Sequence, residues 1–227
     1  TVDTIPGSIW RYSGGGYTIM QQIVKDVSGI ELDEYMEKYI FPEIGMVESS
    51  FEQPINESKH DIASGAYDNQ GDLYKGVWHN YPEIAAAGLW TTPSDLIKYC
   101  LYIQNIYSGK IDGVLTKEIV TKMLSPDKNN WGLGPALNNE GDSLVFGHGG
   151  KNAGFTNNMK AFANNGDAIV VMSNGDNAGR LNDDIIRAVS TFYDWNISNY
   201  VTIRPITIDQ KKLMKFTGKY SYMQNGK

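Results

Sequence analysis

The sequence predicts an α/β protein of the α+β type, in which helices flank an antiparallel β-sheet. Two observations predict this class. Several stretches place apolar residues three and four positions apart, the spacing of one helix face. Two β-prone runs, Met159–Phe162 and Ala168–Met172, flank Asn164-Asn165-Gly166-Asp167, a strong hairpin signal. Helices that bracket such a hairpin bury the apolar face of each element.

The helical spacing and the expected end signals place five helices. Ser13-Gly14-Gly15-Gly16 is interpreted as a sharp turn before the first helix, which Ser28-Gly29 ends. Pro42 is expected to stop the second helix. Thr92-Pro93-Ser94-Asp95 is a helix start with a capping hydroxyl and an early acid, and Thr116 begins a shorter helix. The expected helices are 17–27, 32–40, a long one from 93, 116–124 and 181–195.

Two regions lack a sustained hydrophobic period. Residues 49–82 are polar and rich in Gly, Asn and Asp, so we expect extended loops with short strands that could form a lid over a cleft. Beyond Ile206 the composition changes. We therefore expect one domain over 1–205, and in 206–227 the start of a truncated C-terminal segment or a linker.

Composition limits the classes of partner. The chain has 20 Lys and Arg against 26 Asp and Glu, a net charge of −6 with no basic stripe, which argues against nucleic acid as a ligand. No run of about 18 apolar residues encodes a membrane span. Cys100 is the single cysteine, so no intrachain disulfide can form, and its apolar helical setting predicts a buried thiol. A small molecule or a peptide is the expected ligand.

Two stretches could carry chemistry. Between Phe146 and Phe155 a histidine, His148, lies among four glycines directly before a strand. This pattern fits a strand edge along which a substrate backbone can lie, and it equally fits a glycine-rich turn with an incidental histidine. Tyr12 lies where a loop enters a helix, a position suited to a catalytic base near cations but more commonly used for packing.

Taken together, these stretches resemble the β-lactamase-related serine hydrolases, which include class C β-lactamases, D-Ala-D-Ala carboxypeptidases, penicillin-binding proteins, D-aminopeptidases and related esterases. That family carries SxxK, then YxN or a YxS-like motif, then KTG or HxG. The corresponding stretches are PGSIWRYSGGGYTIMQQIV and FGHGGKNAGF, with AAAGLWTTPSDLIKY and MLSPDKNNWGLG between them. The resemblance runs from Pro6 to about Trp195.

The resemblance implies a β-lactamase/transpeptidase-like fold, incomplete here, and a role for each matching residue. Tyr12 would relay a proton to and from the nucleophile, and His148 would replace the lysine of KTG. Gly14 stands where the motif usually has Asn, which puts β-lactam binding in doubt. The substrate-binding positions implied are Ser13, Gly14, Gly149, Gly150 and Asn152.

The family nucleophile has no counterpart in the expected place. The one Ser-x-x-Lys is Ser125-Pro126-Asp127-Lys128, which follows Tyr12 instead of preceding it and contains a proline. We therefore expect the nucleophile upstream of Thr1, and no activity from this chain alone. His60, His79 and His148 show no metal-ligand spacing, so neither a metal nor a cofactor is expected.

Two functions remain open at this point. The first is a serine hydrolase that opens an amide or ester bond through an acyl-enzyme, with a β-lactam, a D-amino-acid peptide or a small ester as substrate. The alternative is a non-catalytic penicillin-binding-like module that binds peptidoglycan peptides or a protein partner. The resemblance suggests the cell envelope or an extracellular location. A truncated domain should expose apolar edges, so self-association is expected.

Overall fold

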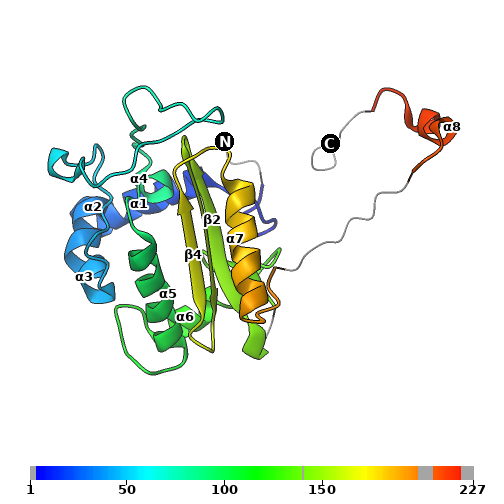
Figure 1. Ribbon diagram of the computed structural model, residues 1–227. Helices are drawn as coiled ribbons and strands as arrows, with labels where there is room; N and C mark the ends of the chain where they lie inside the picture. The colour runs from blue at the N-terminus through cyan, green and yellow to red at the C-terminus, as the bar shows by residue number, and fades with distance from the viewer. Residues whose placement is uncertain (1–3, 140, 199–206, 221–227) are drawn as a thin grey trace.

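The computed structural model describes residues 4–139, 141–198 and 207–220, and its centre is one antiparallel sheet (Figure 1). The strands are β1 Ala136–Asn138, β2 Val145–Asn152, β3 Phe155–Phe162 and β4 Ala168–Ser173, in the order β1-β2-β3-β4. The hairpin predicted around Asn164–Asp167 joins β3 to β4, and β3 begins four residues earlier than expected. The predicted α+β class, with helices flanking an antiparallel sheet, is confirmed.

Two long helices cover the two faces of this sheet. Helix α5, Pro93–Tyr107, packs on the face that carries Phe146 and Ala161, and α7, Gly179–Phe192, packs on the opposite face of β3 and β4 (Figure 1). Successive side chains of a strand point to opposite faces of the sheet, so they pack against α5 and α7 in turn. The main core lies between α5 and the sheet and includes Cys100, Ile103, Ile106, Val120, Leu137, Phe146 and Ala161.

The predicted helix starts at threonine are confirmed. Thr92 Oγ1 accepts a hydrogen bond from the Asp95 N–H at 3.2 Å, and Thr116 Oγ1 accepts one from the Ile119 N–H at 3.2 Å. These caps satisfy amide groups that have no partner inside α5 and α6, Lys117–Met123. Helix α7 ends at Phe192, three residues before the predicted end.

Helix α1, Gly14–Ser28, begins inside the glycine stretch that was interpreted as a turn, so that interpretation was wrong. The Ser13 hydroxyl accepts a hydrogen bond from the Gly16 N–H at 3.0 Å and thereby caps the helix. This bond stabilises a helical first turn even though glycine costs more entropy there than other residues. The predicted end is confirmed, with Gly29 in the left-handed conformation at φ 76°.

The second helical region continues past Pro42, which was expected to stop it. It consists of α2 Leu32–Tyr35, a π-helical turn Met36–Ile40 and α3 Phe41–Ile44. In the π-helical turn the Phe41 N–H reaches back five residues to the Met36 carbonyl. This widened turn directly precedes the proline, whose ring would otherwise crowd the preceding turn of a regular helix.

Residues 49–82 form loops with isolated bridges in place of the expected short strands. The regular element here is a 3-10 turn, Glu57–Lys59, and α4, Ile84–Ala87, follows. The bridges pair Ser50 with Trp90, and Tyr67 with Leu73 and with Gly175. Because the Tyr74 hydroxyl also donates to Asp176 at 2.6 Å, this loop is attached to the β4–α7 connection.

Three short elements complete the description. A 3-10 turn spans Gly141–Ser143, and near the C-terminus α8, Gln210–Leu213, is followed by a 3-10 turn at Met214–Phe216 (Figure 1). The domain boundary predicted between residues 205 and 206 lies outside the described residues.

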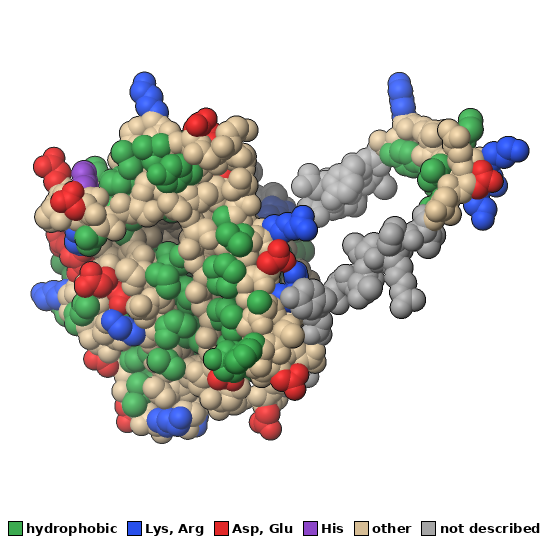
Figure 2. All heavy atoms as spheres, viewed as in Figure 1, with side chains coloured by type: hydrophobic (Ala, Val, Ile, Leu, Met, Phe, Trp, Pro, Cys, Tyr) green, Lys and Arg blue, Asp and Glu red, His purple; other side chains and the backbone are tan. Residues whose placement is uncertain are grey.

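The molecule exposes much apolar surface. No residue of α1 is buried, and its apolar side chains Ile19, Ile23 and Val27 are 64%, 52% and 83% exposed. Figure 2 shows hydrophobic side chains gathered over the middle of one face, with charged side chains nearer its edges. An amphipathic helix with its apolar side in water is a surface that another segment or molecule can cover.

A buried carboxylate ties the chain before Ser50 to the start of α5. Asp95 is 1% exposed and accepts hydrogen bonds from the Glu48 N–H, the Ser49 hydroxyl and the Lys98 ammonium, each at 2.8 Å. Burial alone would raise the pKa of Asp95, but the hydrogen bonds from Lys98, Ser49 and Glu48 together hold it below its ordinary value.

We predict that Asp95→Asn lowers the free energy of unfolding at neutral pH by about 1.5–3 kcal/mol, because bonds to a charged acceptor are weakened. Urea denaturation measures this. Since the folded pKa is depressed, the stabilisation is present above the unfolded pKa and is lost as pH falls through the folded pKa. The difference between wild type and variant should therefore shrink in acid. Glu118→Gln, which breaks an exposed pair with Lys122, is the control and should change stability by less than about 0.5 kcal/mol.

A second prediction concerns Cys100. The side chain is fully buried, and burial raises the pKa of its thiol to about 12. Only the thiolate reacts with disulfide reagents, so Ellman's reagent should label the native chain far more slowly than the urea-unfolded chain. Equal labelling rates in the two states would contradict the buried position.

Candidate functional site

The two residues singled out by sequence lie together although 136 positions separate them. The Tyr12 hydroxyl is 3.5 Å from His148 Nε2, the outer limit of a hydrogen bond, and the rings stack at a centroid distance of 6.1 Å. Trp131 contacts both rings edge-on, and its ring centroid lies 5.8 Å from that of Tyr12 and 5.6 Å from that of His148. Trp131 therefore helps to hold the two polar groups side by side.

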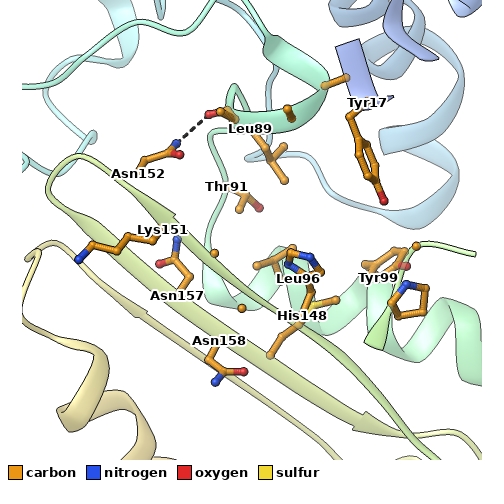
Figure 3. Close-up of a pocket in the computed structure, with 18 of the residues that line it drawn as sticks. Tyr17, Leu89, Thr91, Leu96, Tyr99, His148, Lys151, Asn152, Asn157 and Asn158 are labelled. Atoms are coloured by element: carbon orange, nitrogen blue, oxygen red, sulfur yellow. Dashed lines mark hydrogen bonds between the residues drawn. The ribbon is translucent and has the colours of Figure 1, made fainter. Parts of the chain in front are cut away.

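The Tyr12–His148 pair lies on the wall of a cavity of about 480 Å³ between α1, α4, α5 and the sheet. Figure 3 shows His148 and Asn157 on the sheet side and Leu96 and Tyr99 on the helix side. Other lining side chains are mostly apolar, among them Phe51, Ile84, Leu89, Leu133, Met159 and Met172. A mostly apolar cavity with a few convergent polar groups has the character of a small-molecule site.

Strand β2 supplies one wall of this cavity. The glycine-rich stretch predicted to precede a strand is itself this strand, a correction to the prediction. Strand β1 pairs with β2 only from Val145 to Gly147. From His148 to Asn152, therefore, one edge of β2 has no strand partner among the described residues, and its backbone groups can pair with a ligand.

The structure brings most of the predicted binding positions to the cavity. Gly14, Gly149, Gly150 and Asn152 line it, together with Tyr12 and His148. The Asn152 amide nitrogen donates to the Ala87 carbonyl at 2.8 Å, which attaches α4 to the strand (Figure 3). Ser13 is not among the lining residues, and its hydroxyl is used as the cap of α1.

No serine or cysteine lines the cavity within the described part of the chain. The hydroxyl of Ser125 donates to the Thr121 carbonyl at 2.7 Å, and the Lys128 ammonium donates to the Gly7 carbonyl at 2.8 Å. The two side chains of the one Ser-x-x-Lys motif are thus engaged separately, and neither lines the cavity.

The sequence did not point to several polar residues that line the cavity, among them Tyr17, Tyr99 and Asn157. Tyr17 and Tyr99 point their rings into it, and Asn157 faces it from β3 (Figure 3). Burial raises the pKa of Tyr99 to about 12, and burial followed by the neighbouring Tyr12 raises that of Tyr17. Both phenols are therefore protonated at neutral pH. The alternation of β3 could have indicated Asn157 once the register with β2 was known.

Two more properties concern the part of the chain that the structure describes. None of its helices is long and apolar enough to cross a membrane. No group of three His, Cys, Asp or Glu side chains there is placed to hold a metal ion.

Comparison with known proteins identifies the family. The family model described as Beta-lactamase matches residues 2–191, most of the chain. The chain belongs to the Beta-lactamase family. The predicted membership of the β-lactamase-related serine hydrolases is thereby confirmed. No curated protein matches the chain.

Several solved structures share the fold of this chain. SurE is 19% identical with a TM-score of 0.68 and is matched over 89% of this chain and 49% of its own. The octameric penicillin-binding protein homologue from Pyrococcus abyssi is 23% identical with a TM-score of 0.66, over 85% and 44%. The D-amino acid amidase from Ochrobactrum anthropi is 21% identical with a TM-score of 0.60, over 77% and 52%. The chain therefore spans about half the length of the structures it resembles.

The glycines of β2 in this Beta-lactamase family member permit a sharp test of the site geometry. A Cβ added to Gly147 would lie well under 3.0 Å from the Met159 carbonyl oxygen, whereas one added to Gly150 would meet nothing closer than the Asn157 amide at 4.0 Å. We predict that Gly147→Ala lowers the free energy of unfolding by about 1–3 kcal/mol and that Gly150→Ala changes it by less than about 0.5 kcal/mol. Thermal or urea unfolding measures both. Similar losses in the two variants would contradict the register of β2 and β3.

Proposed function

We propose that this chain is the downstream part of a serine hydrolase that opens amide or ester bonds through an acyl-enzyme. In this proposal the nucleophilic serine and its lysine come from a segment outside residues 1–227. The observation that carries the proposal is the Tyr12–His148 pair beside the unpaired edge of β2, inside a cavity of substrate size. Membership of the Beta-lactamase family supports the same chemistry.

The proposed reaction assigns a task to each part of the cavity. The substrate lies along the edge of β2, and the serine oxygen attacks its carbonyl carbon. Tyr12 accepts the hydroxyl proton and passes it to the departing amine or alcohol, and His148 supports the tyrosine oxygen by a hydrogen bond. Water then attacks the acyl carbon while Tyr12 accepts its proton. The bond to the serine oxygen breaks, and Tyr12 returns the proton to that oxygen. The 3.5 Å separation of Tyr12 and His148 is long for such a bond and is expected to shorten when a substrate binds.

Three substrate classes fit this proposal: β-lactams, D-amino-acid peptides and small esters. The solved D-amino acid amidase and the penicillin-binding protein homologue support amide-type substrates by their names. Gly14 offers no side chain to hold a substrate amide from the α1 side. The octameric homologue and the exposed apolar face of α1 also support self-association of this chain.

Activity measurements on the full-length protein test the role of Tyr12. Tyr12→Phe keeps the ring contacts with Trp131 and His148 but removes the hydroxyl, so kcat should fall about 100-fold or more. Hydrolysis of p-nitrophenyl acetate and of a chromogenic cephalosporin measures this loss. The matched control is Tyr39→Phe, a tyrosine on the π-helical turn outside the cavity, which should leave kcat unchanged.

The 227-residue chain alone provides the complementary test. Because no serine or cysteine lines its described cavity, it should give no burst of p-nitrophenol and no covalent adduct by mass spectrometry. A stoichiometric adduct on any residue of this chain would contradict a nucleophile supplied from elsewhere.

A non-catalytic module that binds peptidoglycan peptides or a protein partner is the second candidate, and Gly14 is the observation that favours it. If the full-length protein hydrolyses none of the three substrate classes but binds peptidoglycan peptides with a measurable Kd, this second function holds. In that case Tyr12→Phe would change the Kd for the peptide, and no hydrolysis would be measured for either wild type or variant.

A further inference from the structure

One polar side chain of the cavity has no task in the proposed reaction. Asn157 lies on β3 directly opposite Gly150 of β2, on the sheet face that also carries His148. In the close-up its side chain projects toward the cavity, whereas that of Asn158 points the other way (Figure 3). Strand alternation produces this difference between the two neighbouring asparagines.

Gly150 leaves the space above Asn157 open. A Cβ at position 150 would lie 4.0 Å from Asn157 Nδ2. A larger side chain at this position of β2 would therefore cover the Asn157 amide, which the glycine leaves accessible. The side-chain amide of Asn157 makes no hydrogen bond to the described residues, and it is only partly buried. It therefore presents a free donor and a free acceptor to a ligand.

Two neighbouring polar side chains of β2 are already engaged. Asn152 donates to the Ala87 carbonyl, and Lys151, on the opposite face, donates to the Asp176 carbonyl at 2.9 Å. Gly14 has no side chain to offer from across the cavity. Asn158 also borders the cavity, but its side chain points to the other face of the sheet (Figure 3). Among the described residues, Asn157 thus carries the one side-chain amide that projects into the cavity with both of its hydrogen-bonding groups free.

We propose that Asn157 is a specificity-determining residue that binds an amide group of the substrate next to the reacting carbonyl. This inference rests on the proposed function, since it takes the Tyr12–His148 end of the cavity as the place of reaction. Diagonal neighbours on paired strands, such as His148 and Asn157, are about 7–8 Å apart. An extended chain advances about 3.3 Å per residue, so an amide one or two residues from the reacting carbonyl reaches Asn157.

This assignment predicts the substrate class. An amide offers both an N–H and a carbonyl, which match the acceptor and the donor of Asn157. An ester in the same position offers no N–H and leaves the asparagine oxygen without a partner. Acylated amino acids and peptides are therefore preferred over substrates that carry an ester next to the reacting carbonyl.

Binding to the 227-residue chain tests the assignment without turnover. The probes are N-acetyl-D-alanine N-methylamide and its analogue in which an ester oxygen replaces the acetamide N–H, and NMR titration gives both Kd values. Wild type should bind the amide about fivefold more tightly, the worth of about one hydrogen bond. Asn157→Ala and the similarly sized Asn157→Leu should bind both probes equally.

The matched controls are Asn158→Ala and Asn158→Leu, which alter the neighbouring side chain on the other face and should keep the fivefold preference. If the preference survives in both Asn157 variants, or if wild type shows no saturable binding in the cavity, the inference is overturned. Neither result touches the Tyr12→Phe measurement on the full-length protein, so the proposed function and this inference can fail independently.

Discussion

The antiparallel pairing of β2 with β3 is the constraint on which the rest of the site depends. Its register places Gly147 opposite Lys160 and His148 opposite Met159. At Gly147 the two backbones approach so closely that no side chain fits, which makes this glycine a requirement of the pairing. Side chains alternate along a strand, so a shift of the pairing register by one residue would turn His148 to the α7 side of the sheet. His148 would then lose its contact with Tyr12.

The elements around this hairpin differ in how readily the sequence predicts them. Helix starts at Thr92 and Thr116 depend on a hydroxyl and an N–H three residues apart, so local sequence suffices. The path through Pro42 was missed because it depends on a π-helical turn, which leaves no propensity signal. The glycines before Tyr17 were missed for the opposite reason: their low helix propensity is overridden by the cap at Ser13.

The site shows the same division. Tyr12 and His148 could be named from motif order, and the fold brings them together across 136 residues. Trp131 does not line the cavity itself, but it contacts both rings and helps to hold them side by side. Asn157 carries no motif at all. Its place follows from the register with Gly150, a long-range pairing that hydrophobic periodicity does not encode.

The cavity is lined almost entirely by uncharged groups. Among the described lining residues no side chain is acidic, and the one cation, Lys151, is turned toward Asp176, which also holds the Gly154 N–H at 3.0 Å. Tyr17 and Tyr99 remain protonated because burial disfavours their phenolates. A charged substrate group would find no opposite charge here, whereas an uncharged amide would find donors and acceptors already in place. In the proposed reaction the serine would therefore rely on Tyr12 and on the lysine that accompanies it, since the described lining supplies no carboxylate base.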